Sequence, residues 1–392
     1  MKQILIVAQV IPQWYVDTLT EAFGEKAKID IITGSDVGGN VIPSPQYDPT
    51  SFKSRLICWW RHYQFMTSWM KKNTDKHYDV IFAISNPPIN SYIGLKLRKQ
   101  FQAPFFYMNW DLYPQCIEYM IKSPGVKLVC RLWHHWNSRN YPKIDCMLTI
   151  GDVVAESINR DLKNKIQIHV IPIATDTEKL SPVAKTENPF CIKYSLTDKF
   201  VVIYSGKMGY GHNIEVILKA AEALQEQQQI QFVFIGEGPK YQVVQDFICE
   251  HGTKNILLLP LQPEETFPLS MACGDIGIVS QEAAMAHLFM PSKTYSMMAC
   301  GMAIVGICSE HDDLQQMIET MQIGTCVYGK PDTKLEDVIL DLYHDRDKLQ
   351  KMQNRALQAA RERYSKNMVV EAYRQLFQKY LEYEGEPNEV CN

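Results

Sequence analysis

Residues 200–224, FVVIYSGKMGYGHNIEVILKAAEAL, decide the fold of this chain. The stretch begins with β-branched and aromatic residues, continues through a glycine-rich segment, and ends with apolar residues that recur at helical spacing from 214 to 224. This order predicts a strand, a tight loop and a helix. Together they form the repeating unit of an α/β protein with a parallel sheet.

The loop of this unit carries groups that suit an anion. Gly206, Gly209 and Gly211 permit positive φ and close backbone approach, and Asn213 is a favourable N-cap for the helix. A helix N-terminus presents free N–H groups and the positive end of the helix dipole, and Lys207 adds a mobile charge within the loop. The segment predicts a phosphate site, although a glycine-rich turn can also be only a close connection.

Two better-known phosphate motifs do not fit this stretch. Its order of glycines, Gly-x-x-Gly-x-Gly, differs from the dinucleotide fingerprint. Gly206 and Gly211 have the Walker A spacing, but His212 and Asn213 stand where that motif needs Lys and Ser or Thr. We therefore expect neither a Rossmann dinucleotide fingerprint nor a Walker A loop.

Composition indicates an ordinary globular protein of two domains. The chain has 392 residues, 46% of them hydrophobic and 21% charged, which is enough for two domains of roughly 190 residues each. A net charge of −4 gives no electrostatic footprint for nucleic-acid binding. Eleven scattered cysteines without C-x-x-C pairs indicate a reduced, cytosolic protein. The N-terminal apolar run predicts a strand, with no signal peptide and no transmembrane span.

Strand-like apolar runs form two series, one in each half of the chain. They are residues 4–8, 29–33, 80–85, 105–108, 146–150 and 169–173, then 200–204, 231–235, 256–259, 276–280 and 303–307. Helix-length segments between most of them predict two parallel sheets covered on both faces, with the polar segment 174–199 as linker. We expect domains at 1–180 and 181–365, a returning helix at 366–392, and ligands in the cleft beyond the carboxyl ends of the strands.

Residues 55–72, RLICWWRHYQFMTSWMKK, form a predicted helix with an aromatic face. Its apolar residues at helical spacing are Leu56, Trp59, Trp60, Tyr63, Met66 and Met70. Such a stripe most often packs in a core. Tryptophan beside basic residues also suits the headgroup region of a membrane, and a groove for an amphiphilic acceptor would use the same residues. The pattern leaves these three interpretations open.

Two further segments carry candidate site residues. In NWDLYPQ, residues 109–115, Asp111 follows a predicted strand, where cleft chemistry is done, although Asp is also a common turn residue. In MPSKTYSMMACGMAIVG, residues 290–306, Pro291 begins a predicted helix, Ser292 can cap it, and Lys293 lies in its first turn. A lysine there opposes the helix dipole, which is costly unless an anion is bound. Lys293 is therefore the strongest single candidate for function.

These motifs resemble the GT-B fold of retaining glycosyltransferases, specifically the family-4 enzymes that build bacterial surface polysaccharide and lipopolysaccharide. The likeness runs through SNPP (85–88), NWDLYP (109–114), YSGKMGYGHN (204–213), GEGP (236–239) and PSKTYSMMACG (291–301). It implies two Rossmann-like domains facing a cleft, with C-terminal helices that cross back to the first domain. It also implies that the second domain holds a nucleotide-sugar by its diphosphate and that the first presents the acceptor.

The resemblance implies catalytic roles for three residues. Lys207 and Lys293 would hold the diphosphate, and Asp111 would act on the acceptor side. Further residues would complete the nucleotide-sugar site, namely Gly206, Gly209, Gly211, Glu282, Ser292, Thr294 and Ser296. No metal-ligand cluster is visible in the sequence, so we expect the two lysines to play the part of a metal and no cofactor to be needed.

The chain departs from the family's pattern at the ribose site. Relatives carry an E-x7-E motif whose final Glu binds the ribose hydroxyls, and the two acidic positions are Leu288 and Ser296 here. Glu282 lies upstream and can offer a carboxylate, but at a different spacing. The first loop also has Pro12 and Gln13 where many relatives have a glycine-rich turn.

The function expected from this resemblance is transfer of a sugar from a nucleotide-sugar, of the UDP class, to a lipid-linked or saccharide acceptor. The protein would be cytoplasmic and peripheral on the inner face of an anionic membrane, with no nucleic-acid partner. Two alternatives stay open. One is a sugar-nucleotide epimerase of the same fold, and the other is a nucleotide-binding scaffold that is inert because Ser296 replaces the acid.

Overall fold

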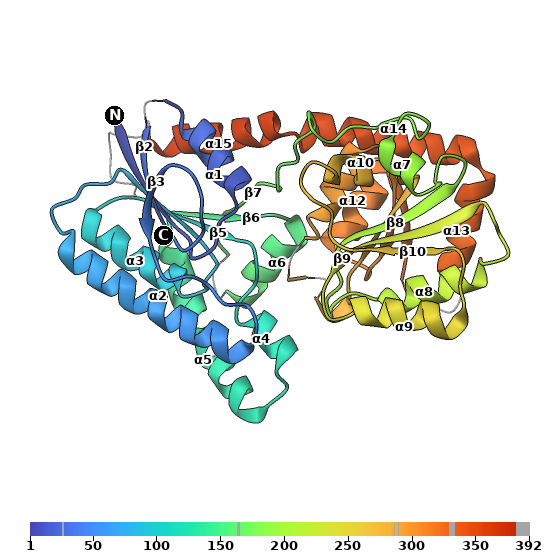
Figure 1. The fold of residues 1–392 in the computed structure, drawn as a ribbon. Helices are drawn as coiled ribbons and strands as arrows, with labels where there is room; N and C mark the ends of the chain where they lie inside the picture. Colours follow the sequence, from blue (N-terminus) through green and yellow to red (C-terminus); the bar gives the residue numbers. More distant parts are fainter. Residues whose placement is uncertain (26, 163–164, 286, 289, 329–333, 382–392) are drawn as a thin grey trace. The chain divides into compact units, whose positions relative to one another are not determined.

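The computed structural model describes residues 1–381 apart from 26, 163–164, 286, 289 and 329–333. The chain divides into two compact units: Met1–Pro172 with the C-terminal segment that starts at Asn367, and Ile173–Lys366 (Figure 1). The segment 174–199, expected as a linker, lies in the second unit, where Thr175 pairs with Ser365.

A seven-stranded, fully parallel sheet forms the centre of the first unit, in the order β3-β2-β1-β4-β5-β6-β7. The strands are β1 (Lys2–Val7), β2 (Ala27–Thr33), β3 (Asn40–Pro43), β4 (Val80–Ile84), β5 (Phe105–Asn109), β6 (Cys146–Thr149) and β7 (Ile168–Val170). The helices are α1 (Gln13–Phe23), α2 (Phe52–Lys72), α3 (Asn90–Phe101), α4 (Gln115–Met120), α5 (Pro124–Asn140), α6 (Asp152–Asp161) and α15 (Lys366–Leu381). Every residue of β4 and β5 is buried, as expected for central strands covered on both faces.

The C-terminal helix α15 packs on the first unit, as the resemblance implied. The hydroxyl groups of Tyr15 and Tyr373 lie 2.7 Å apart, and the ring centroids of Phe23 and Phe377 lie 3.8 Å apart. In Figure 1 this helix runs beside α1 although the two are at opposite ends of the sequence. The chain therefore uses its last described residues to complete the core that its first residues begin.

The second unit has a six-stranded parallel sheet in the order β10-β9-β8-β11-β12-β13. The strands are β8 (Phe200–Lys207), β9 (Ile230–Glu237), β10 (Ile256–Leu259), β11 (Ile276–Ser280), β12 (Ala303–Ile307) and β13 (Gly324–Val327). The helices are α7 (Pro189–Lys193), α8 (Ile214–Ala223), α9 (Tyr241–His251), α10 (Phe267–Met271), α11 (Lys293–Ala299), α12 (Asp313–Met321), α13 (Leu335–His344) and α14 (Arg346–Arg363). One continuous core joins the aromatic residues of β8 and β9 to the apolar faces of α8 and α13.

In this sheet β8 continues further than predicted. Gly206 and Lys207 pair with Gly236 and Glu237 of β9, so Lys207 is the last residue of a strand and not a loop residue. Its carbonyl accepts a hydrogen bond from the Tyr204 hydroxyl at 2.9 Å, and its side chain is exposed. Gly206 does not end β8, because it pairs with Gly236 of β9.

Strand order reverses beside the first strand of each sheet, between β1 and β4 and between β8 and β11. In open parallel sheets the carboxyl ends of the strands at such a point leave a crevice for ligands. The candidate residues of both units follow strands near these points.

Within the described ranges, every helix is too short or too polar to cross a lipid bilayer.

Candidate active site

The carboxyl ends of β8 and β9 approach each other through glycines. A Cβ placed on Gly236 would lie 1.9 Å from the carbonyl oxygen of Gly206, and one on Gly238 would lie 2.7 Å from that of Met208. Real side chains do not tolerate such distances, so glycine is required at both positions. The backbone therefore carries no side chains at these positions beside β8, and a ligand can approach this bare glycine backbone closely.

Lys293, the first residue of α11, lies over this glycine backbone. A Cβ on Gly206 would be 3.5 Å from its Cε and 3.6 Å from its Nζ. The Nζ atom is buried, lies 3.9 Å from the centroid of the Tyr204 ring, and has no hydrogen-bond partner within the described part of the chain. Burial lowers the pKa of Lys293 to about 7. Because a buried ammonium group without a partner is costly, this side chain is poised to receive an anion.

The loop after β8 is fastened to the end of β11. His212 Nδ1 lies 2.8 Å from the carbonyl oxygen of Ser280, and the N–H of Asn213 donates to Ser280 Oγ at 2.7 Å. Asn213 does stand at the N-cap of α8, but its side chain makes no capping hydrogen bond. The loop is therefore held by β11 and not by a cap.

His212 belongs to the same cluster, although the sequence singled it out only as a residue that breaks a Walker A motif. Burial, and then the charge of Lys293, lowers its pKa. A Cβ on Gly209 would lie 3.6 Å from the His212 ring, and the N–H of Glu282 donates to the carbonyl of Gly211 at 3.1 Å. These contacts bring Glu282 close to His212, whose pKa its charge tends to raise. A histidine directly after the last loop glycine was the only signal in the sequence.

The other residues that were predicted to bind the nucleotide-sugar lie at the start of α11. Ser292 is exposed and does not cap the helix with its side chain. Thr294 is fully buried, and its hydroxyl donates to the carbonyl of Pro291 at 2.8 Å, which holds the turn before the helix. Ser296 is half-buried and lies one turn after Lys293, on the same side of the helix. Of these three, Ser296 is placed best to share a ligand with Lys293.

Asp111 lies in the first unit, in the loop after β5. The N–H groups of Trp110 and Asp111 donate to Ser85 Oγ at 3.0 and 3.2 Å, which ties the loop to the end of β4. The Asp111 side chain is half-buried; burial raises its pKa to about 6, while the positive charge of Arg55 acts in the opposite direction. At neutral pH this carboxyl is mainly ionised and can accept a hydrogen bond from a hydroxyl group.

An apolar cavity of about 540 Å³ lies in the same unit, between α2, the start of α3 and α5. Six of the residues that line it are aromatic: Trp59, Trp60, Tyr63, Tyr92, Trp133 and Trp136. The stripe predicted on α2 does not pack as one core face, because Met66 and Met70 are buried whereas Leu56 and Trp60 are 45% and 58% exposed. The helix also buries Trp59 of the stripe, together with Cys58 and His62 from outside it, and leaves Leu56 and Trp60 exposed at the cavity.

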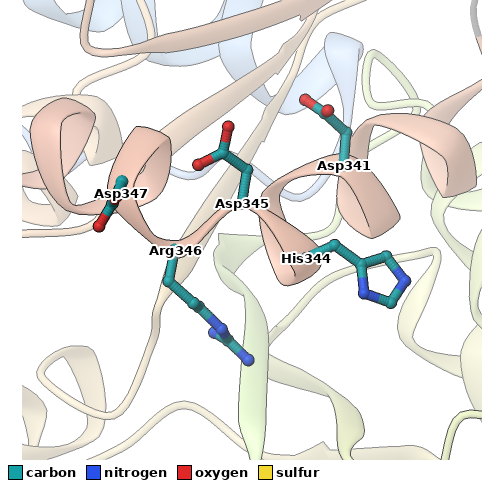
Figure 2. Close-up of a pocket in the computed structure, with 5 residues that line it drawn as sticks. All are labelled: Asp341, His344, Asp345, Arg346 and Asp347. Atoms are coloured by element: carbon teal, nitrogen blue, oxygen red, sulfur yellow. The ribbon is translucent and has the colours of Figure 1, made fainter.

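A separate hollow of about 630 Å³ lies at the junction of α13 and α14. The charged side chains that line it point in different directions and not toward a common point (Figure 2). Asp341 is paired with Lys348 at 2.7 Å, and the guanidinium of Arg346 lies 4.6 Å from the centroid of the Phe200 ring. Nor do His, Cys, Asp and Glu form a metal-binding group anywhere in the described residues. This hollow is therefore no candidate for the active site.

Comparison with known proteins bears on the second unit. Residues 192–362 match the family described as "Glycosyl transferases group 1". This segment contains β8, α11 and all the candidate residues of the second unit. The bare glycine backbone and Lys293 therefore lie in the segment that is similar to the group 1 glycosyl transferases.

Sequence relatives carry related names. The chain is 28% identical over 131 residues to "Putative colanic acid biosynthesis glycosyl transferase WcaI" of Escherichia coli (strain K12), a match that covers 33% of this chain and 32% of the relative. It is 23% identical over 249 residues to "Probable glycosyltransferase WbjE" of Pseudomonas aeruginosa, covering 63% of this chain and 61% of the relative. The chain thus matches about a third and about three fifths of the length of these two relatives.

Solved structures resemble nearly the whole chain. Sucrose-phosphate synthase from Thermosynechococcus elongatus matches with a TM-score of 0.75 and 16% identity over 97% of this chain and 99% of that chain. Anabaena Alr3699/HepE, solved in complex with UDP and glucose, matches with a TM-score of 0.70 and 14% identity over 97% of this chain and 100% of that chain. At such identities the likeness concerns the fold, which is GT-B, as the sequence predicted.

Proposed function

We propose that this protein is a retaining glycosyltransferase that moves a sugar from a nucleotide-sugar of the UDP class to a lipid- or polysaccharide-linked acceptor in cell-surface polysaccharide biosynthesis. The observation that carries the proposal is Lys293, a buried ammonium group without a hydrogen-bond partner in the described residues. It lies over a bare glycine backbone inside the segment that is similar to the group 1 glycosyl transferases. A diphosphate satisfies both features, since it offers anionic oxygens to the lysine and accepts hydrogen bonds from backbone N–H groups.

The proposed chemistry is mainly electrostatic. The bond between the anomeric carbon and the donor phosphate oxygen breaks, the acceptor hydroxyl oxygen bonds to the same face of that carbon, and its proton passes to the departing phosphate. Negative charge grows on the diphosphate as it leaves, and Lys293, Lys207 and the glycine backbone stabilise that charge. In this proposal the two lysines take the part that a metal ion plays in other transferases.

A hollow of about 470 Å³ beside the glycines suits the nucleoside. It is lined by Gly236, Glu237 and Gly238 at the end of β9, by Tyr241, and by Pro260 and Leu261 after β10. Gly236 also abuts Gly206, the residue under Lys293. A nucleotide can therefore place its phosphates under Lys293 and its nucleoside along the end of β9.

In the first unit, Asp111 is proposed to act on the acceptor. Its ionised carboxyl can accept a hydrogen bond from the acceptor hydroxyl and orient it. The protein is proposed to work in the cytoplasm at the inner face of the membrane. Two helices support that placement, because neither α2 nor α5 contains an acidic residue, whereas α2 ends in Lys71 and Lys72.

A thermal-shift screen of nucleotide-sugars tests the proposal first. A ligand at a hundred times its dissociation constant adds about 2.7 kcal/mol to the stability of the folded protein. We expect UDP and one UDP-sugar to shift unfolding, and that sugar to be transferred when a lipid-linked saccharide is added. Conversion of the sugar to its epimer without acceptor would indicate an epimerase, and binding without any turnover an inert scaffold. If no nucleotide-sugar binds, the proposal is wrong.

A further inference from the structure

The cavity between α2, α3 and α5 belongs to the first unit, whereas the residues proposed to bind the donor belong to the second. Its walls are almost wholly apolar, and two of the residues at its edge, Leu56 and Trp60, leave 45% and 58% of their surface in water. Covering these apolar side chains with an apolar ligand would remove their surface from water, which is favourable. Exposed aromatic residues around a preformed cavity are typical of a binding site for an apolar ligand.

A cation lies beside the cavity, and its two longest helices carry no acid. Its two long walls, α2 and α5, contain no Asp or Glu. The amine of Lys96 lies 5.6 Å from the ring centroid of Tyr63 and 4.5 Å from that of Tyr92, and both rings line the cavity. An apolar space with a cation beside it complements a hydrocarbon chain that carries an anionic head.

One cation connects the cavity with the candidate acid. Arg55 directly precedes the lining residue Leu56 on α2, and its charge acts on Asp111. Its Nε is buried without a hydrogen-bond partner in the described residues, although Nη2 donates to the carbonyl of Pro49 at 3.4 Å. A guanidinium group with an unused buried donor is suited to a phosphate oxygen.

We propose that this cavity binds the hydrocarbon chain of a lipid phosphate, with Arg55 on the phosphate and the carried saccharide directed toward Asp111. The inference rests on the proposed function only for its place in the reaction, where the lipid phosphate is the carrier of the acceptor. Binding of the lipid chain itself depends only on the cavity and its charges.

Titration with octyl, decyl, dodecyl and tetradecyl phosphate, each below its micelle concentration, tests the cavity. Four of the seven tryptophans line it, so intrinsic fluorescence reports occupancy. Affinity should rise roughly fourfold for each added methylene that is buried. Because the cavity is finite, the gain should stop once it is full. Absence of saturable binding, or an affinity that does not rise with chain length, overturns the proposal.

Matched variants separate the cavity from general surface attraction. Trp60→Asp places a charge at the cavity edge on an exposed residue, so the fold should tolerate it, and dodecyl phosphate should bind at least tenfold more weakly; Leu56→Asp is the second variant. Leu132→Asp is the control, because Leu132 is 64% exposed on α5 but does not line the cavity. Its affinity should equal that of the parent. Equal losses in Trp60→Asp and Leu132→Asp would mean that the whole face is only hydrophobic, and the proposal fails.

Arg55→Gln tests the head group. Dodecyl phosphate should bind this variant no better than dodecanol, whereas the parent should prefer the phosphate by tenfold or more. If the parent shows no such preference, Arg55 is not the phosphate ligand. UDP-induced thermal shifts measured on the same variants distinguish the two proposals. If a variant loses alkyl phosphate binding but still binds UDP, the substitution has affected the cavity and not the nucleotide site. If the parent binds alkyl phosphate but no nucleotide-sugar, only the proposed function is contradicted.

Discussion

The candidate sites of the two units are built from different groups. In the second unit, the site proposed for the donor consists of backbone, with glycines that pack against each other and one buried lysine above them. In the first unit, the site proposed for the acceptor consists of side chains, a half-buried acid and an aromatic cavity. Burial shifts both ionisable groups toward their neutral forms: the pKa of Lys293 falls to about 7 and that of Asp111 rises to about 6.

Asp111 and Lys293 differ in the charges and hydrogen-bond partners around them. Asp111 already has a positive charge nearby in Arg55, which offsets part of the effect of burial. Lys293 has a ring beneath it and no hydrogen-bond partner among the described residues. An anion bound beside Lys293 would restore its charge, whereas Asp111 is already mainly ionised at neutral pH. Changes in the second unit should therefore alter donor binding and turnover together, and changes in the first should alter transfer alone.

The largest effect is expected for Lys293→Met. Loss of one preorganised charge next to the developing negative charge should lower turnover on the order of 10²- to 10³-fold, and weaken UDP binding less than that. Lys207→Met is predicted to act in the same direction. Lys207→Arg should retain activity, because Lys207 is exposed, and Lys293→Arg should not, because its amine lies against Tyr204. Steady-state kinetics with UDP titrations provide the check; parental behaviour of both Met variants would contradict the phosphate clamp.

Gly236→Ala should disturb the backbone of the site proposed for the donor. The new methyl group would meet the carbonyl of Gly206, so we expect a loss of about 2 to 4 kcal/mol of unfolding free energy, with weaker UDP binding. Gly252→Ala is the matched control, since Gly252 also has positive φ, +61°, but nothing lies near its Cβ position. It should cost only about 1 to 2 kcal/mol. Urea unfolding of both variants measures the difference, and equal costs would contradict close packing of the two strand ends.

Asp111→Asn should distinguish the role of the first unit from that of the second. If the carboxylate orients the acceptor, transfer should fall roughly a hundredfold while UDP affinity stays at the parental value. The ionised form prevails above the pKa of about 6, so the parental rate should climb with pH up to that region, and the Asn variant should lack this step. Transfer assays across this pH range test it. A large loss of UDP affinity would show that Asp111 serves the donor.

The smallest effect is expected for Ser296→Glu, which restores an acid one turn after Lys293. A carboxylate makes a hydrogen bond worth about 1 kcal/mol more than a hydroxyl does, so UDP should bind roughly fivefold more tightly. Calorimetry measures the change. Unchanged or weaker binding would indicate that ribose is recognised elsewhere, with Glu282 the next candidate.

Much of the fold could be predicted because buried parallel strands are apolar runs between helices. The edge strand β3 was missed, since NVIP is short and largely unburied, and β13, GTCV, was missed because it is short and begins with glycine. The end of β8 was misplaced because a glycine usually marks a break, whereas Gly206 here pairs with Gly236. Lys207 was therefore assigned to a loop.

The sequence predicted a site residue where a side chain has an unfavourable charge for its position. Lys293 drew attention because a lysine opposes the dipole at a helix start. His212 was missed because its neighbours come from β11. The exposed edge of α2 was one of three interpretations left open, because six apolar residues on one helix do not show which of them a partner covers. The cavity needs α3 and α5 as well, which no local pattern supplies.

The central claim is that Lys293 holds the donor diphosphate, and its titration offers the most direct test. The pKa of about 7 in the folded protein lies below the ordinary lysine value of about 10.4, so the unliganded amine loses its proton above pH 7. Folding stability should therefore rise as pH increases from about 7 toward 10, because the unfolded chain retains a proton that the folded chain has lost. Across the same range a diphosphate is mainly in its fully ionised form and favours the charged lysine.

Calorimetric titration of UDP into the parent and Lys293→Met from pH 7 upward is the decisive measurement. We predict that parental affinity falls with rising pH, approaching tenfold per pH unit, because binding must return a proton to Lys293. The Met variant should bind weakly and with an affinity that does not change across this range. Equal affinity of the two proteins, or the same pH dependence in both, would contradict the account.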